Sequence, residues 1–219
     1  MIPSPGVIGL KAVNICLPDG TLRKLADLQS YFVAEAARTR TAGMSDTGTL
    51  TARARAARKG RLDIEKEQLR LQGRLIDSKR ALVMVGLVQE IASRGWQERT
   101  WGPLPGQSRG RWPGSANGNW PDKMTVDLPA DLVNTVKAGC WDTSKEAVGF
   151  LREWRDRYPA ARPTCPTRPG CPPEAVAEYH RYAARVLTAG AIWRLAVERG
   201  IATALARRSE EGGYTLRRR

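Results

Sequence analysis

The side chains that most often carry out catalysis or bind metals are scarce in this sequence. Its 219 residues include one histidine, His180, and four cysteines. A single histidine argues against histidine-based acid–base or triad catalysis. Cys165 and Cys171 lie in a proline-rich stretch, at a spacing that fits neither a zinc knuckle nor a redox Cys-x-x-Cys pair. With His180 they still lack an evident fourth metal ligand, so we predict no metal site and a structural role for His180.

A glycine-rich phosphate loop of the kind found in nucleotide-binding enzymes is not recognisable either. The glycines of residues 102–118 neither follow a predicted strand nor begin a predicted helix, which such a loop requires. We therefore predict a protein that is not an enzyme and that has no cofactor.

Positive charge is the property of the sequence that most limits the possible classes of function. The chain has 36 Lys and Arg against 22 Asp and Glu, a formal net charge of +14. Such an excess predicts attraction to polyanions, above all nucleic acid, and we expect DNA rather than RNA. The alternatives are a ribosome-bound protein or one that is merely very soluble.

Much of this charge lies in residues 49–80, which we predict to form one long basic helix. Its first five basic residues follow one another with no acidic residue between them: Arg53, Arg55, Arg58, Lys59 and Arg61. We predict that these five side chains contact nucleic-acid phosphates, the alternative being a solvated helix face.

The same helix has two apolar stripes, continued by a predicted helix at 81–95. One stripe repeats every seven residues: Leu62, Leu69, Ile76 and Val83. The other is partly opposed to it: Ile64, Leu71, Leu75 and Leu82. A helix packed on two sides indicates a homo-oligomer. The stretch Arg61–Ile76 resembles the charged, leucine-rich helix of small terminase subunits from tailed phages, and the resemblance implies a ring that binds viral DNA for packaging.

Residues 122–158 follow a different pattern, a strand and then two helices. The apolar residues of the strand alternate with polar ones: Met124, Val126 and Leu128. This period of two is typical of a half-buried strand, which Pro129 ends. Apolar residues at helical spacing follow: Leu132, Val133, Val136 and Cys140. Thr143 and Glu146 have the form of a capping box, which predicts a break at residues 141–142 and a second helix ending before Pro159.

This order of elements resembles the ribbon-helix-helix family of DNA-binding proteins. The residues that carry the resemblance are the strand Met124–Pro129, the amphipathic helix after it, and the helix start Thr143–Ala147. The resemblance implies that two chains pair their strands and that the antiparallel ribbon enters the major groove of DNA. A small packing unit with no DNA contact is the alternative.

The same resemblance assigns roles to particular side chains. Lys123 and Thr125 would read base edges, and Ser144 and Lys145 would contact a phosphate at the start of the second helix. Asp127 shares the outward face of the strand and would need to accept a hydrogen bond from a cytosine amino group.

A second stretch of the chain has a similar pattern. Val13–Pro18 and Met124–Pro129 both read apolar-polar-apolar-x-Leu-Pro, and both precede a predicted helix, the first at residues 22–40. A degenerate repeat of this kind would let two strands of one chain pair as a pseudo-dimer. Coincidence is the interpretation we prefer.

The remaining segments connect or extend these units. Gly102–Pro121 is predicted to be a linker whose Trp112 and Trp120 dock on a neighbouring domain, the alternative being stacking on unpaired bases. A stiff proline-rich spacer is followed by helix, with breaks expected near Gly190 and Gly200, and by a basic tail. The predicted division of the chain is 1–48, 49–101, 102–121, 122–158, 159–173 and 174–219.

Taken together, these patterns predict a mainly α protein with a long basic helix and a small ribbon-helix-helix-like module. The first hypothesis is a non-enzymatic, dimeric DNA-binding regulator or a partition factor of a plasmid or phage. A packaging ring and a scaffold protein with incidental charge are the alternatives. No apolar run approaches membrane-span length and no secretory signal is recognisable, so we expect no membrane partner and a location in the bacterial host cytoplasm or nucleoid.

Overall fold

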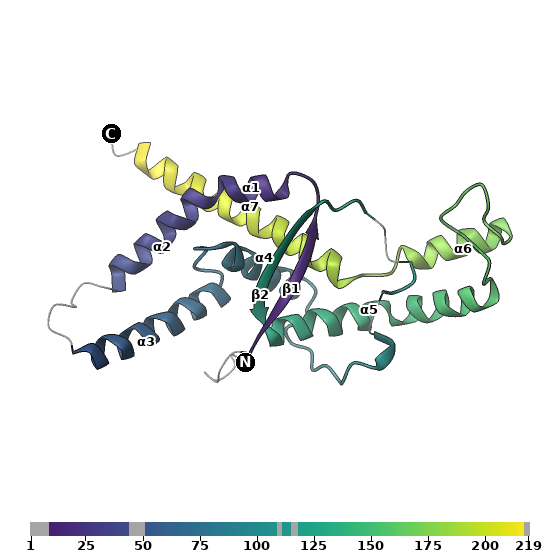
Figure 1. The fold of residues 1–219 in the computed structure, drawn as a ribbon, viewed down its shortest axis with the longest axis horizontal. Helices are drawn as coiled ribbons and strands as arrows, with labels where there is room; N and C mark the ends of the chain where they lie inside the picture. Colours follow the sequence, from purple (N-terminus) through teal and green to yellow (C-terminus); the bar gives the residue numbers. More distant parts are fainter. Residues whose placement is uncertain (1–8, 44–50, 109–110, 115–117, 217–219) are drawn as a thin grey trace.

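The computed structural model describes residues 9–43, 51–108, 111–114 and 118–216. Within them the chain is mainly helical and has one two-stranded sheet, which confirms the predicted fold class (Figure 1). The first half contains β1 (Leu10–Leu17), α1 (Thr21–Asp27), α2 (Gln29–Gly43), α3 (Ala52–Leu71) and α4 (Lys79–Ser93). After a 3-10 turn, η1 (Gly106–Ser108), come β2 (Asp122–Pro129), α5 (Ala130–Arg157), α6 (Pro173–Ala183) and α7 (Ala189–Leu216).

The two strands pair with each other inside one chain. β1 and β2 are antiparallel, with Val13 opposite Val126 and Asn14 opposite Thr125. The intrachain pairing of two similar strands is therefore correct, and coincidence, the interpretation preferred from the sequence, is wrong. A second chain is not needed to complete the ribbon at Met124–Leu128, because β1 of the same chain pairs with β2 there, and the expected dimer stays a prediction.

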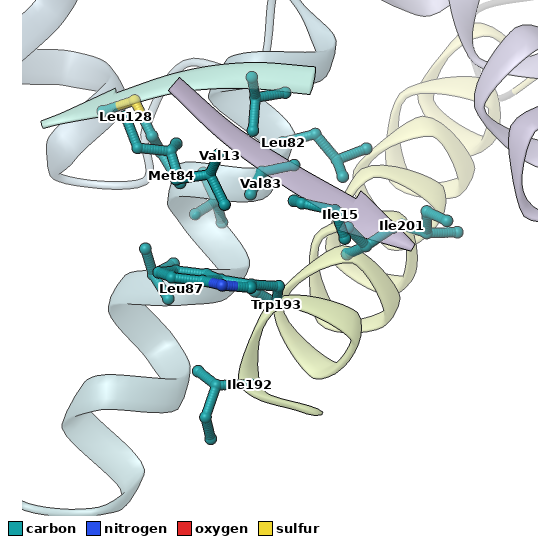
Figure 2. Packing of buried hydrophobic residues seen from close by; sticks show 14 of the residues in the cluster. Val13, Ile15, Leu82, Val83, Met84, Leu87, Leu128, Ile192, Trp193 and Ile201 are labelled. Carbon is teal, nitrogen blue, oxygen red and sulfur yellow. The ribbon is translucent and has the colours of Figure 1, made fainter. Parts of the chain in front are cut away.

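One face of this ribbon forms part of the main hydrophobic core. Its inward side chains are buried: Val13, Ile15, Leu17, Val126 and Leu128. Figure 2 shows Val13 and Ile15 beside side chains of α4 and α7, among them Leu82 and Ile201. The alternation predicted for residues 124–128 is thus confirmed, since the apolar side of the pleat covers two helices.

Helices α4 and α7 cross at two glycines. A Cβ atom on Gly86 would lie 1.8 Å from the carbonyl oxygen of Ala196, and one on Gly200 would lie 2.3 Å from that of Leu82. A helix break near Gly200 was therefore the wrong prediction, because this glycine lets α7 approach α4 rather than ending it. The break expected near Gly190 is confirmed between α6 and α7.

The predicted long helix at 49–80 is in fact two helices. Gly73 has a φ of 69°, and its amide donates to Arg70 while the amide of Arg74 donates to Leu69. These two hydrogen bonds form a Schellman motif, which ends α3. Ser78 then caps α4 by accepting a hydrogen bond from the amide of Ala81 at 3.2 Å.

Because α3 and α4 are separate helices, no single helix carries both apolar stripes along their full length. The stripes therefore no longer indicate an oligomer. The last members of both stripes lie in the connecting loop or in α4, where they are buried: Leu75, Ile76, Leu82 and Val83. None of the described α3 residues is buried.

The predicted break at residues 141–142 is also wrong. α5 is continuous, and its buried residues follow one another at helical spacing across the expected break: Val136, Cys140, Ser144, Ala147, Val148 and Leu151. The Thr143 hydroxyl donates to the carbonyl of Gly139 at 2.8 Å, as Ser and Thr do inside helices, and caps no helix start. Buried contacts along the whole face therefore override the local capping pattern.

The tryptophans of the linker at 102–121 dock on the folded chain, as predicted. The Trp112 ring packs edge-on against Trp141, with ring centroids 5.8 Å apart. The Arg194 guanidinium of α7 lies 4.0 Å from the centre of the Trp120 ring.

None of the helices within the described residues combines the length and the hydropathy that a membrane span requires. The last three arginines of the basic tail, 217–219, lie outside the described residues.

Candidate nucleic-acid interface

The second face of the ribbon points to solvent, because successive side chains of a strand alternate between faces. We call the following exposed residues the outer face: Ala12, Asn14, Cys16, Lys123, Thr125 and Asp127. In the register of the sheet they form three cross-strand pairs: Ala12 with Asp127, Asn14 with Thr125, and Cys16 with Lys123. The two predicted base-reading residues, Lys123 and Thr125, therefore lie on one exposed surface.

A hydrogen bond orders the centre of the outer face. The Thr125 hydroxyl donates to Oδ1 of Asn14 at 2.7 Å. This contact fixes the orientation of the Asn14 side-chain amide, so that its NH₂ group can donate a hydrogen bond to an acceptor on another molecule. Sequence reasoning missed Asn14 as a site residue. The signal that would have found it was the similarity between Val13–Pro18 and Met124–Pro129.

Side-chain contacts hold both ends of the ribbon in place. At one end Oδ2 of Asp122 accepts a hydrogen bond from the amide of Leu22 at 2.8 Å, and so satisfies a donor in the first turn of α1. At the other end Nζ of Lys11 donates to Asn134 at 2.8 Å, and Nε of Arg80 donates to the carbonyl oxygen of Asp127 at 2.6 Å. The outer face is thus a surface supported from α1, α4 and α5.

Arg80 also connects the ribbon to the basic helix α3. Its Nη2 atom lies 2.6 Å from Oε1 of Glu67, while Arg70 pairs with Glu67 at 3.2 Å and with Asp77 at 2.6 Å. The hydrogen bonds that Arg70 donates to the Asp77 carboxylate are the main cause that raises the pKa of Arg70. This network fixes the end of α3 that is nearer to the ribbon. Figure 1 shows that the rest of α3 extends away from the core.

The predicted phosphate-contacting residues lie on that extended part of α3. Arg53, Arg55, Lys59 and Arg61 are exposed, and Arg58 is half-buried. Thr51 caps the helix by accepting a hydrogen bond from Ala54 at 3.3 Å. At about 100° per residue, the five basic side chains are spread around the helix rather than gathered in one line. α3 therefore presents positive charge on several sides.

Ser144 and Lys145 do not join the outer face. Ser144 is buried inside α5, where its hydroxyl donates to the carbonyl of Leu187 at 3.2 Å and accepts from the amide of Leu187 at 2.8 Å. Because α5 is continuous, the helix start that would have bound a phosphate does not exist at this position. Lys145 is exposed but pairs with Asp142 at 2.8 Å, and this hydrogen bond is the main cause that lowers the pKa of Asp142.

Ser144 instead connects α5 to the segment before α7, which gives a testable expectation. Replacing Ser144 with Ala leaves the half-buried amide and carbonyl of Leu187 without their side-chain partner, and we expect the free energy of unfolding to fall by about 1–3 kcal/mol. Urea denaturation followed by tryptophan fluorescence measures this change. DNA affinity should stay unchanged when both proteins are folded. A loss of affinity without a loss of stability would contradict the structural role.

The remaining polar candidates are structural or isolated. Nε2 of His180 lies 3.1 Å from the carbonyl oxygen of Pro163, and Cys165 and Cys171 are free thiols. Among the described residues no cluster of His, Cys, Asp and Glu could hold a metal ion. Burial raises the pKa of the Cys140 thiol to about 12, so it is protonated at neutral pH.

No family model, curated protein or solved structure matches this chain.

Proposed function

We propose that this chain is a non-enzymatic protein that binds double-stranded DNA through the outer face of its ribbon. The observation that carries the proposal is a two-stranded antiparallel ribbon whose inner face is buried and whose outer face is polar and exposed. A two-stranded ribbon fits the major groove of B-DNA. The Asn14 amide, the Lys123 ammonium and the Thr125 hydroxyl are groups of the kind that read base edges there.

The outer face contributes little to the overall attraction, because it holds one lysine and one aspartate. Phosphate affinity would come mainly from α3 and from the general excess of positive charge. Arg80 donates a hydrogen bond to the ribbon and forms an ion pair with Glu67 of α3. These two contacts hold the end of α3 that is nearer to the ribbon in a fixed position beside it. This arrangement supports a division in which α3 positions the protein and the ribbon selects the site. Such a protein would serve as a regulator or as a partition factor of a plasmid or phage.

A test of the ribbon begins with a preferred site obtained by selection from random duplexes. Replacing Thr125 or Lys123 with Ala should weaken binding to that site roughly tenfold, because each change removes a base contact. Binding to unrelated DNA should change little, which a competition titration at constant salt measures. Lys24→Ala, an exposed lysine on α1, is the matched control for the loss of charge. Equal losses for specific and unrelated DNA would contradict the proposal.

A DNA-packaging ring is the second candidate, and one observation favours it. Ile64 of α3 is 54% exposed, on a helix whose described residues are all unburied, and subunit contacts in a ring would cover it. Light scattering coupled to size exclusion distinguishes the two candidates. A mass of many subunits would favour the ring, whereas a monomer would leave the ribbon proposal as the better account.

A further inference from the structure

The ribbon has an approximate two-fold axis that relates its two strands. Asn14 is the second residue of the pattern Val13–Pro18, and Thr125 is the second residue of the pattern Met124–Pro129. These equivalent residues lie opposite each other in the sheet, and the neighbouring pairs place Val13 opposite Val126 and Ile15 opposite Met124. Equivalent positions therefore exchange about an axis through Asn14 and Thr125. In a homodimer this axis would relate two chains, but here one chain supplies both strands.

The outer face does not obey this symmetry chemically. About the axis, Asn14 corresponds to Thr125, Ala12 corresponds to Lys123, and Cys16 corresponds to Asp127. A methyl group is thus matched with an ammonium group, an amide with a hydroxyl, and a thiol with a carboxylate. In each pair the hydrogen-bonding capacity differs.

Identical half-sites in DNA reflect identical protein halves, because a symmetric dimer makes the same contacts twice. This chain cannot do so. At one end of the ribbon Lys123 donates, which suits the guanine acceptors O6 and N7. At the other end Asp127 only accepts, which suits the cytosine amino group, while the counterpart of Lys123 is the small Ala12. The positions at which a base pair is specified therefore differ between the two halves.

We infer that a single copy of this chain reads a non-palindromic DNA site. The inference rests on the proposed function and adds the symmetry class of its DNA target. One chain suffices because β1 and β2 already complete the ribbon. The site is asymmetric because the three symmetry-related pairs of the outer face differ in chemistry.

The experiment selects binding sites from a library of random duplexes with the full-length chain, and then counts chains per duplex by native mass spectrometry. The expected result is an enriched motif without two-fold symmetry, bound by one chain. A duplex made palindromic by duplicating either half of the motif should bind about tenfold more weakly, since one base contact is lost.

A matched variant makes the outer face symmetric without changing its net charge. Ala12→Lys, Asn14→Thr and Cys16→Asp together give both halves lysine, threonine and aspartate, all at exposed positions. Circular dichroism checks that the variant folds. The enriched motif of this variant should be palindromic, still with one chain per duplex.

Two kinds of outcome overturn the inference, and they are distinguishable. A palindromic motif for the native chain, whether bound by one copy or two, refutes the inference of a non-palindromic site but leaves the proposed DNA binding intact. Absence of any enriched motif, or of any binding, refutes the inference and the proposed function together.

Discussion

Neutralising the exposed basic residues of α3 is expected to reduce duplex DNA affinity roughly 100-fold at physiological salt, the largest functional effect that we predict. The variant carries four changes to glutamine: Arg53, Arg55, Lys59 and Arg61. Each phosphate contact releases about one condensed counterion, so the slope of log affinity against log salt should become shallower by about 2 to 4. Filter binding or fluorescence anisotropy across a salt series measures both quantities.

The control removes the same charge elsewhere on the molecule. Four exposed arginines near the far end of α5 are changed to glutamine: Arg155, Arg157, Arg162 and Arg168. Figure 1 shows that this end of α5, next to α6, lies at the opposite end of the molecule from α3. Equal losses of affinity in the two variants would mean that net charge alone attracts DNA, and would remove α3 from the interface.

Replacing Gly86 with Ala should lower the free energy of unfolding by about 3 kcal/mol or more, the largest stability effect that we predict. The new methyl group would lie 1.8 Å from the carbonyl oxygen of Ala196 and 2.8 Å from the amide nitrogen of Gly200. Both atoms belong to the backbone of α7, so no side chain can turn aside to make room. The two helices would have to separate, and the core around Leu87 and Trp193 would open (Figure 2).

Urea denaturation followed by tryptophan fluorescence measures this loss, and Gly60→Ala is the matched control. Gly60 also lies within a helix, but apart from its chain neighbours and the adjacent backbone of α3 no atom lies within 4 Å of the position where its Cβ would be. Alanine there should increase the stability of α3 by up to about 1 kcal/mol, because its helix propensity is higher. A small effect at both glycines would show that α4 and α7 tolerate a wider separation than their packing indicates.

Elements that depend on neighbouring residues were predicted well. Residues 124–128 form a strand with the expected inward side chains, and the apolar face of the helix after Pro129 is buried as predicted. The helix predicted at 22–40 is observed as α1 and α2, with Leu25 and Phe32 buried. A period of two or of 3.6 residues is a local property, so a single sequence reveals it.

Boundaries inside long helical stretches were predicted less well, because local and tertiary terms compete there. Gly73 and Ser78 carry the signals that end α3 and begin α4, but the apolar pattern continued through both. Thr143 carries a capping pattern, but the buried face of α5 outweighs it. In both places the segment that packs on the core decided the boundary.

The same distinction between local patterns and long-range contacts applies to the residues of the candidate site. Residue type and spacing were enough to place Lys123 and Thr125 on the exposed side of a strand and to show that the start of α3 is basic. The three-dimensional fold was needed to establish that β1, more than a hundred residues away, completes the ribbon and contributes Asn14. It also decided that Ser144 is buried against Leu187. The physical reason is that strand pairing and helix docking depend on contacts between distant segments, which no local period encodes.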